Sequence, residues 1–136
     1  MSASTSGALK ALIEAAGLGL SAYRDRPSDE HALPYVTIHE EIVLVPDAGA
    51  NDDSSGATGK ETAQVDLWQA WRDPNTGALV ESYTLPRALN AALKGAQLPT
   101  APDLVYGVKV RSRLRLLERD DNVVHHAYTL EIVRAF

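Results

Sequence analysis

The sequence predicts a single α+β domain in which a largely antiparallel or mixed sheet of about five strands carries two helices on one face. Three observations predict this fold. The chain has 136 residues, the size of one domain. Two short stretches repeat apolar residues at helical spacing. Five stretches have the residue pattern of strands and follow closely enough to pair with their neighbours, in the order α-β-β-β-α-β-β over residues 1–136.

The two helices are predicted from apolar stripes and from the residues that flank them. The first is expected over Ala8–Ala16, with Gly17 as its stop signal. The second is expected over Leu85–Lys94, with Thr84 as the N-cap and Gly95 at its end. Both stripes require burial, so we expect the two helices to share one face of the sheet.

The strands are predicted from alternating or β-branched residues and from the turn residues between them. The pair Glu40-Glu41 interrupts the alternation of its strand, which indicates a bulge there. The stretch Thr62–Trp71 carries large apolar residues on both faces, as expected inside a sheet. Residues 78–83 are open between a helix extension and irregular chain. The strands are expected at residues 20–26, 35–45, 62–71, 104–118 and 123–135.

A flexible loop is predicted at residues 47–60. From Asp47 to Gly59 no apolar residue is larger than alanine. Such a segment buries too little surface to offset the entropy of ordering. We therefore expect this loop to become ordered only against a neighbouring molecule.

Composition excludes several classes of protein. The net charge of −5 argues against indiscriminate binding of nucleic acid. The chain has no cysteine, so it cannot form a disulfide or a thiolate metal site. The first residues lack the pattern of a secretion signal, and no apolar run is long enough to span a membrane. We expect a protein that is made in a cytoplasm and contacts no membrane.

No catalytic, cofactor or metal site is predicted. Gly56–Lys60 lacks the spacing of a phosphate-binding loop, and the paired aspartates lie in polar turns. His125 and His126 are adjacent in a strand and point to opposite faces. One of them could meet His39 near the Glu40-Glu41 pair, but solvated or packed histidines are the expectation because no helical metal-binding spacing exists.

The informative pattern is one of charge. Four basic residues alternate in the strand at 104–118 and are expected to share one face, whereas residues 27–59 hold seven acids and no lysine or arginine. The ordinary interpretation is that the basic strand and the acidic region are each simply exposed to solvent. Together the two surfaces suit head-to-tail self-association. The candidate interface residues are Lys109, Arg111, Arg113, Arg115, Glu40, Glu41, Asp47, Asp52 and Asp53.

Four motifs in order resemble a known family. They are an Ala8-Leu-Lys-Ala-Leu-Ile13 helix, Leu33-Pro-Tyr-Val-Thr-Ile38, Gln64-Val-Asp-Leu-Trp68 after a polar loop, and Leu85-Pro-Arg-Ala-Leu-Asn-Ala-Ala-Leu93. Each motif alone is common, and their order carries the resemblance. Over nearly its whole length the chain resembles the tail terminator, or tail-completion, proteins of long-tailed bacteriophages.

The resemblance implies a structural protein of the virion with no catalysis and no cofactor. It implies an α/β subunit that assembles as a hexameric ring at the head-proximal end of the tail tube, stops tube polymerisation and presents a surface to the head connector. The implied partners are other copies of itself, the tail tube protein and the connector or stopper, with the tape-measure protein or DNA passing through the lumen.

Three alternatives remain at the sequence level. The first is another ring protein of the neck, or the tail tube protein. The second is a small non-viral α+β binding domain or enzyme, although no convergent set of polar residues supports a pocket. The third is a nucleic-acid-binding domain that uses the strip Lys109–Arg115, although the strip has no interleaved aromatic residues for stacking on bases.

Overall fold

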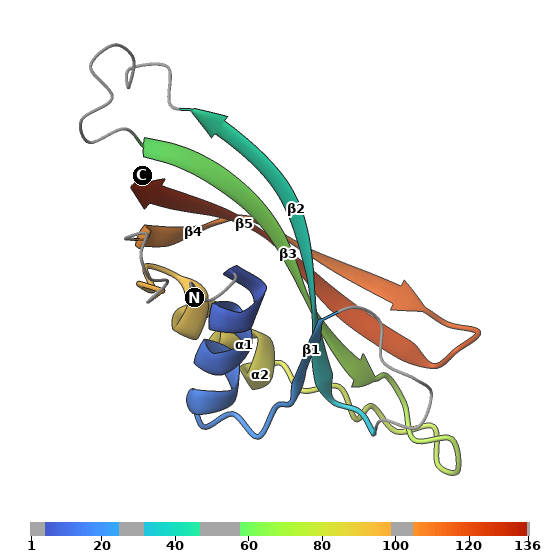
Figure 1. Ribbon diagram of the computed structural model, residues 1–136. Helices are drawn as coiled ribbons and strands as arrows, with labels where there is room; N and C mark the ends of the chain where they lie inside the picture. Colours follow the sequence, from blue (N-terminus) through green and yellow to red (C-terminus); the bar gives the residue numbers. More distant parts are fainter. Residues whose placement is uncertain (1–4, 25–31, 47–57, 99–104, 136) are drawn as a thin grey trace.

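The expected order of elements is confirmed in the computed structural model, which describes residues 5–24, 32–46, 58–98 and 105–135. Two helices lie on the same face of a curved five-stranded sheet (Figure 1). None of the described helices is long and apolar enough to cross a membrane. The elements are α1 (Thr5–Ala15), β1 (Ala22–Arg24), β2 (Tyr35–Pro46), β3 (Thr58–Ala70), α2 (Thr84–Leu93), β4 (Val105–Glu118) and β5 (Val123–Ala135).

The sheet is mixed, with the strand order β1-β2-β3-β5-β4. β1 is parallel to β2, and the other three pairings are antiparallel. β3 is the central strand, which confirms that a strand with large residues on both faces lies inside the sheet. The edges are β4 on one side and, on the other, the three-residue β1, which covers β2 only at Val36–Ile38.

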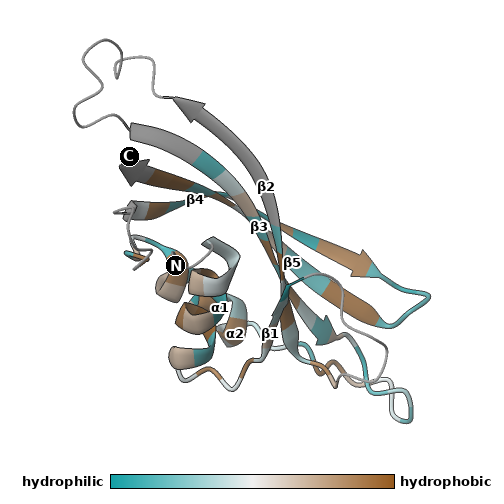
Figure 2. Ribbon diagram, viewed as in Figure 1, coloured by the Kyte–Doolittle hydropathy of each residue, from teal (hydrophilic) through white to brown (hydrophobic). Residues whose placement is uncertain are grey.

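The core lies between the helices and the sheet. Figure 2 shows apolar residues both on the helices and in the strands beside them. Leu9 and Ile13 of α1 and Leu89 and Leu93 of α2 are fully buried. They pack with alternate residues of the strands, and burial of each such side chain contributes about 1.5–3 kcal/mol. The sheet residues of this core are Ala22, Val36, Ile38, Ala63, Val65, Leu67, Val108, Tyr128, Leu130 and Ile132.

Two strand details differ from the expectation or refine it. β3 begins at Thr58 rather than at Thr62, because residues from Thr58 onward pair with the end of β5 at Ala135. The predicted loop at 47–60 is therefore wrong at its end, and its remainder, residues 47–57, lies outside the described residues. The expected irregularity of β2 is confirmed, because its pairing with β3 shifts between Glu41 and Val45.

The N-terminus of α2 is capped differently from the prediction. The helix begins at Thr84, but the threonine hydroxyl is not the cap. The backbone N–H of Leu85 donates to Oγ of Ser82 at 3.1 Å. The hydroxyl of Ser82, which precedes the N-cap residue Tyr83, thus accepts from one of the free N–H donors at the helix start, as was expected of Thr84.

Candidate functional site

The predicted basic strip is divided between the two faces of the sheet. Directly paired residues of antiparallel strands share a face. Lys109 pairs with Glu131 on the face away from the helices. The register shifts between Val110 and Ser112, and beyond this bulge Arg113 and Arg115 pair with β5 residues of the helix-bearing face. The expectation of one continuous strip was wrong because a single extra residue reverses the alternation.

The same bulge brings two leucines to the surface. Leu114 and Leu116 pair with Ala127 and His125 on the face away from the helices, and they are 59% and 44% exposed. An uninterrupted alternation along β4 would place them with Val108 and Val110, which do face the helices. The distal half of β4 therefore presents apolar side chains where basic ones were expected.

Arg111, at the bulge, is engaged within its own chain. Its Nε and Nη2 donate to the two carboxylate oxygens of Glu131 at 2.9 and 2.7 Å. This bidentate contact raises the pKa of Arg111 through the hydrogen bonds from the guanidinium. Arg111 therefore orders the surface of β4 and β5 and offers less free charge to a partner than a solvated arginine.

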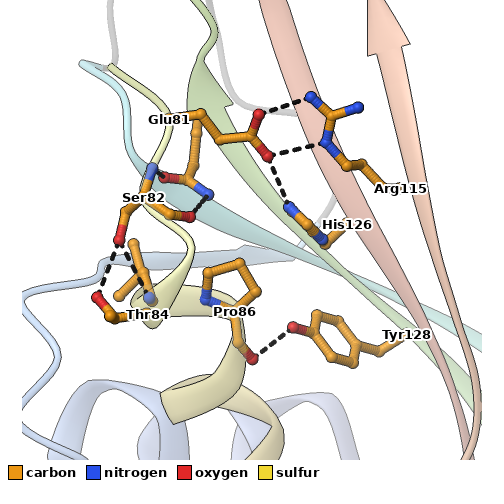
Figure 3. Close-up of polar contacts among 9 residues, drawn as sticks. Glu81, Ser82, Thr84, Pro86, Arg115, His126 and Tyr128 are labelled. Atoms are coloured by element: carbon orange, nitrogen blue, oxygen red, sulfur yellow. Dashed lines mark hydrogen bonds and ion pairs between the residues drawn. The ribbon is translucent and has the colours of Figure 1, made fainter. Parts of the chain in front are cut away.

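Arg115 takes part in a buried cluster that the sequence pattern did not reveal (Figure 3). Its Nε and Nη2 donate to the carboxylate of Glu81 at 2.9 and 2.6 Å. The Glu81 side chain has no exposed surface, whereas that of Arg115 is 40% exposed. Nε2 of His126 lies 3.2 Å from Oε2 of the same carboxylate, the oxygen that also accepts from Nε of Arg115. One buried carboxylate thus joins a cation on β4 to an imidazole on β5.

The charge states in this cluster follow from its contacts. Hydrogen bonding from Arg115 lowers the pKa of Glu81, so its carboxylate is ionised and can only accept. Burial lowers the pKa of His126, which favours the neutral imidazole. A neutral ring facing an ionised carboxylate must carry its proton on Nε2. The cluster therefore holds one ion pair and one hydrogen bond from a neutral histidine.

Further contacts fasten the segment that carries Glu81. The side-chain amide of Gln69 donates to the carbonyl oxygen of Ser82 and accepts from its N–H, at 3.2 and 2.9 Å. The hydroxyl of Tyr128 donates to the carbonyl oxygen of Pro86 at 2.7 Å. Residues 78–83 are therefore irregular chain and not an extension of the helix. Side chains of the sheet hold this segment in place.

The segment also displays apolar side chains. Leu79, Val80 and Tyr83 are each at least half exposed. The backbone beneath them is well bonded, since the N–H of Val80 donates to the carbonyl oxygen of Trp71 and that of Asp73 to the carbonyl oxygen of Ala78. We call residues 72–83 the strap. It is a hydrogen-bonded, apolar surface element, and its first residue, Arg72, exchanges hydrogen bonds with Asn122 in the turn of the β4–β5 hairpin.

The acidic half of the predicted interface is described only in part. Glu40 and Glu41 belong to β2, where they pair with Ala63 and Thr62 of β3. Asp47, Asp52 and Asp53 lie outside the described residues. The structure therefore does not test the contact between these acids and the basic residues of β4, and the charge complementarity between copies stays a prediction.

The described histidines, His39, His125 and His126, do not converge on one site. His39 pairs with Gln64, whereas His125 pairs with Trp68, four residues further along β3, and His126 lies on the opposite face. Among the residues that the structure describes, no group of three or more histidine or acidic side chains could hold a metal ion. The described face without helices instead carries an aromatic row, in which the ring centroids of Trp68 and His125 lie 4.1 Å apart.

The sequence of the chain matches a known protein family over almost its whole length. A protein family described as "Tail completion protein gp17" matches residues 3–134. The chain belongs to this family. The resemblance inferred from the four ordered motifs is thereby confirmed. No curated protein matches the sequence.

A solved structure supports the fold of this tail completion family member. The chain is similar to one described as "Virion of native gene transfer agent (GTA) particle", with a TM-score of 0.62 and 16% sequence identity. The alignment covers 94% of this chain and 84% of the other. At this identity the similarity shows a shared fold.

One feature of the sequence indicates the buried cluster around Glu81. Glu81 is a lone acid after Ala78-Leu-Val80 and shortly before a helix. A charged residue in an apolar run is rarely buried without a partner. Its partners could not be assigned from the sequence, because Arg115 changes face only through the bulge.

Proposed function

We propose that this chain is a structural protein of a phage-type virion that forms a ring, of six copies, at the head-proximal end of the tail tube. The ring ends tube polymerisation and provides the docking surface for the head connector. The observation that carries the proposal is the match to the tail completion family over residues 3–134.

The open sheet supports ring formation. β4 is an edge strand, and on the opposite edge β2 extends beyond the short β1. Unpaired strand edges are favourable sites for pairing with another chain. Because the two edges differ, copies that meet edge to edge form a heterologous contact, which closes into a ring when the rotation permits.

The charged residues would orient this contact rather than supply most of its free energy. Exposed ion pairs are screened by salt and mainly affect orientation and association rate. Among the basic residues, Arg111 and Arg115 already bind acids of their own chain, so Lys109 and Arg113 are the freer cations. The proposed acidic partners on the neighbouring copy are Glu40, Glu41, Asp47, Asp52 and Asp53.

The proposed partners and location follow from the ring. The tail tube protein would contact one face, the connector or stopper the other, and the tape-measure protein or DNA would pass through the lumen. The protein would assemble in the host cytoplasm and remain at the head-proximal end of the tail. We propose no catalytic step and no cofactor.

Electron microscopy of particles that lack this protein tests the proposal. Abnormally long tails without heads are the expected result, because tube polymerisation would not stop. Tails of normal length would contradict the terminator role and favour another ring of the neck. Absence of any tube would favour the tail tube protein.

The ring itself is tested on the purified protein. Sedimentation velocity and negative-stain images should show closed rings of one size. A protein that stays monomeric at every concentration, both alone and with tail tube ends, would exclude a ring.

A further inference from the structure

The residues that the structure describes expose large apolar side chains in two places. One set lies on the strap and the other on β4. Single exposed apolar residues are ordinary, whereas groups of them mark contact surfaces. We call Leu79, Val80 and Tyr83 the strap surface. We call Leu114 and Leu116 the arm surface, because they lie on the projecting end of the β4–β5 hairpin.

The arm surface faces away from the helices and has an acid beside it. Leu114, Leu116 and Glu118 pair with alternate residues of β5, so their side chains share one face. The arginines that follow the bulge pair with β5 residues of the opposite face. The hairpin extends beyond the part of the sheet that the helices cover (Figure 1). The two leucines are therefore accessible to another molecule.

The turn next to the arm surface is acidic. Asp120 and Asp121 are exposed. The cation of this turn, Arg119, lies over the ring of Trp71, with its guanidinium carbon 6.0 Å from the ring centroid. The charge that the tip of the hairpin offers to a partner is therefore negative.

The strap surface has cations beside it, on the other side of the hairpin. Glu81 of the strap binds Arg115 on the helix-bearing face. The pKa of Arg115 is raised first by its hydrogen bonds to Glu81, and the nearby Tyr83 adds to this rise. Arg113 is exposed and lies two residues before Arg115 on the same face of β4. Tyr83, which is 62% exposed, thus lies in a basic environment.

The strap presents its surface from a fixed backbone. The side-chain amide of Gln69 bonds to both backbone groups of Ser82, next to Tyr83. At the other end of the strap, Arg72 exchanges hydrogen bonds with Asn122 of the hairpin turn. A surface that is already ordered loses less entropy when a partner binds.

The two surfaces complement each other. Both offer apolar side chains for burial, and one has arginines beside it where the other has acids. Because Tyr83 and the leucines of the arm lie on opposite sides of the hairpin, they cannot meet within one chain. The arm surface of one copy can meet the strap surface of another. Such a contact is heterologous, so it repeats from copy to copy and closes into a ring when the rotation permits.

We propose that the arm surface of one copy packs on the strap surface of the next copy in the ring, with the acidic tip of the arm toward Arg113 and Arg115. This inference rests on the proposed ring. The apolar side chains supply most of the free energy, since exposed ion pairs contribute little. The contact uses side chains on the faces of the hairpin, so it leaves the backbone of the sheet edges available. A different protein on either surface is less favoured, because the two surfaces match within one sequence.

Truncation of either surface tests the contact. The strap variant carries Leu79→Ser and Tyr83→Ser, and the arm variant carries Leu114→Ser and Leu116→Ser. We expect each to need a roughly tenfold or higher concentration for half-assembly in sedimentation velocity, because buried apolar anchors dominate interfaces. Ala91→Ser, at an exposed position of α2, is the control and should assemble normally. Since all these positions are exposed, each variant should melt like the wild type at a concentration where the wild type is monomeric.

Cysteine cross-linking identifies which surfaces meet. The chain has no cysteine, so each introduced thiol is unique. Tyr83→Cys and Leu116→Cys proteins are mixed, assembled and treated with a short bis-maleimide. We expect linked dimers in the mixture and none in either protein alone, because the strap surface meets the arm surface and not itself. Ala91→Cys mixed with Leu116→Cys is the control and should not link.

The outcomes separate this inference from the proposed function. If the wild type never self-associates, both are wrong. If the wild type assembles and a folded variant assembles equally well, or if the cysteine mixture does not link, the contact is wrong while the ring stands. Links within a single cysteine protein would show that each surface meets its own kind and would overturn the contact. Normal assembly of both variants with loss of binding to tail tube ends would reassign the two surfaces to the tube protein.

Discussion

Glu81 is a single residue on which three elements depend. Its carboxylate binds Arg115 of β4 and His126 of β5, and its backbone belongs to the strap. We expect Glu81→Ala to lower the free energy of unfolding by about 2–3 kcal/mol, because a buried donor and a partly buried cation lose their acceptor. Chemical denaturation measures this change. Asp120→Ala, in the exposed β4–β5 turn, is the control and should leave the midpoint unchanged.

The same cluster makes stability depend on pH. The folded-state pKa values of Glu81 and His126 both lie below their ordinary values of 4.5 and 6.5, so the unfolded chain binds more protons. The contribution of His126 is complete above about pH 6.5 and is lost as the pH falls toward its folded-state pKa. That of Glu81 is complete above about pH 4.5 and is lost below.

His126→Gln separates the two contributions. A glutamine amide can donate to Glu81 and does not titrate. We expect the wild type to lose thermal stability between pH 7 and pH 5, and the variant to lose less over the same interval. Parallel slopes for the two proteins would show that another group controls this pH range.

At the scale of the element, α2 is fixed through a narrow apolar stripe. Leu89 is fully buried, whereas Ala91, two positions later, is exposed. We expect Leu89→Asp to unfold the domain, because an uncompensated charge would enter the core. Ala91→Asp should remain folded by circular dichroism. A native melting curve for Leu89→Asp would contradict the packing of α2 on the sheet.

The bulge in β4 gives a second prediction at this scale. Before the bulge Val108 is buried, and after it Leu116 is exposed, although an uninterrupted alternation would put both on one face. Val108→Ser should lower the free energy of unfolding by about 1–3 kcal/mol, through lost burial and an added hydroxyl. Leu116→Ser should change it by less than about 0.5 kcal/mol, as at other surface positions. Equal effects in denaturant titrations would place the register differently.

At the scale of the whole molecule, self-association is linked to stability. An assembly that binds only folded subunits raises the apparent stability as concentration rises. We expect the thermal midpoint of the purified protein to increase over roughly a hundredfold range of concentration. A midpoint independent of concentration in the wild type would argue against a ring in solution.

The sequence was sufficient to predict the helices and strands. It was insufficient to predict which face of the sheet a side chain occupies where one extra residue changes the alternation. Both helices and all five strands could be predicted, because apolar spacing and turn residues act locally. The bulge in β4 could not be predicted, because one extra residue leaves no trace in the composition of a strand. The prediction of a single basic strip was wrong for that reason. The Glu81 cluster joins residues up to 45 positions apart, so its partners depend on the pairing of β4 with β5.

The order of the strands also bears on when a subunit becomes competent to assemble. β5 leaves the ribosome after the other four strands, yet it lies between β3 and β4. Until it is inserted, the central strand has one neighbour and β4 has none. Pairings between distant parts of a chain form slowly, so the β4 edge that the proposed ring would use exists only on a finished sheet. If the proposed ring forms through this edge, the topology itself would exclude incomplete chains from it.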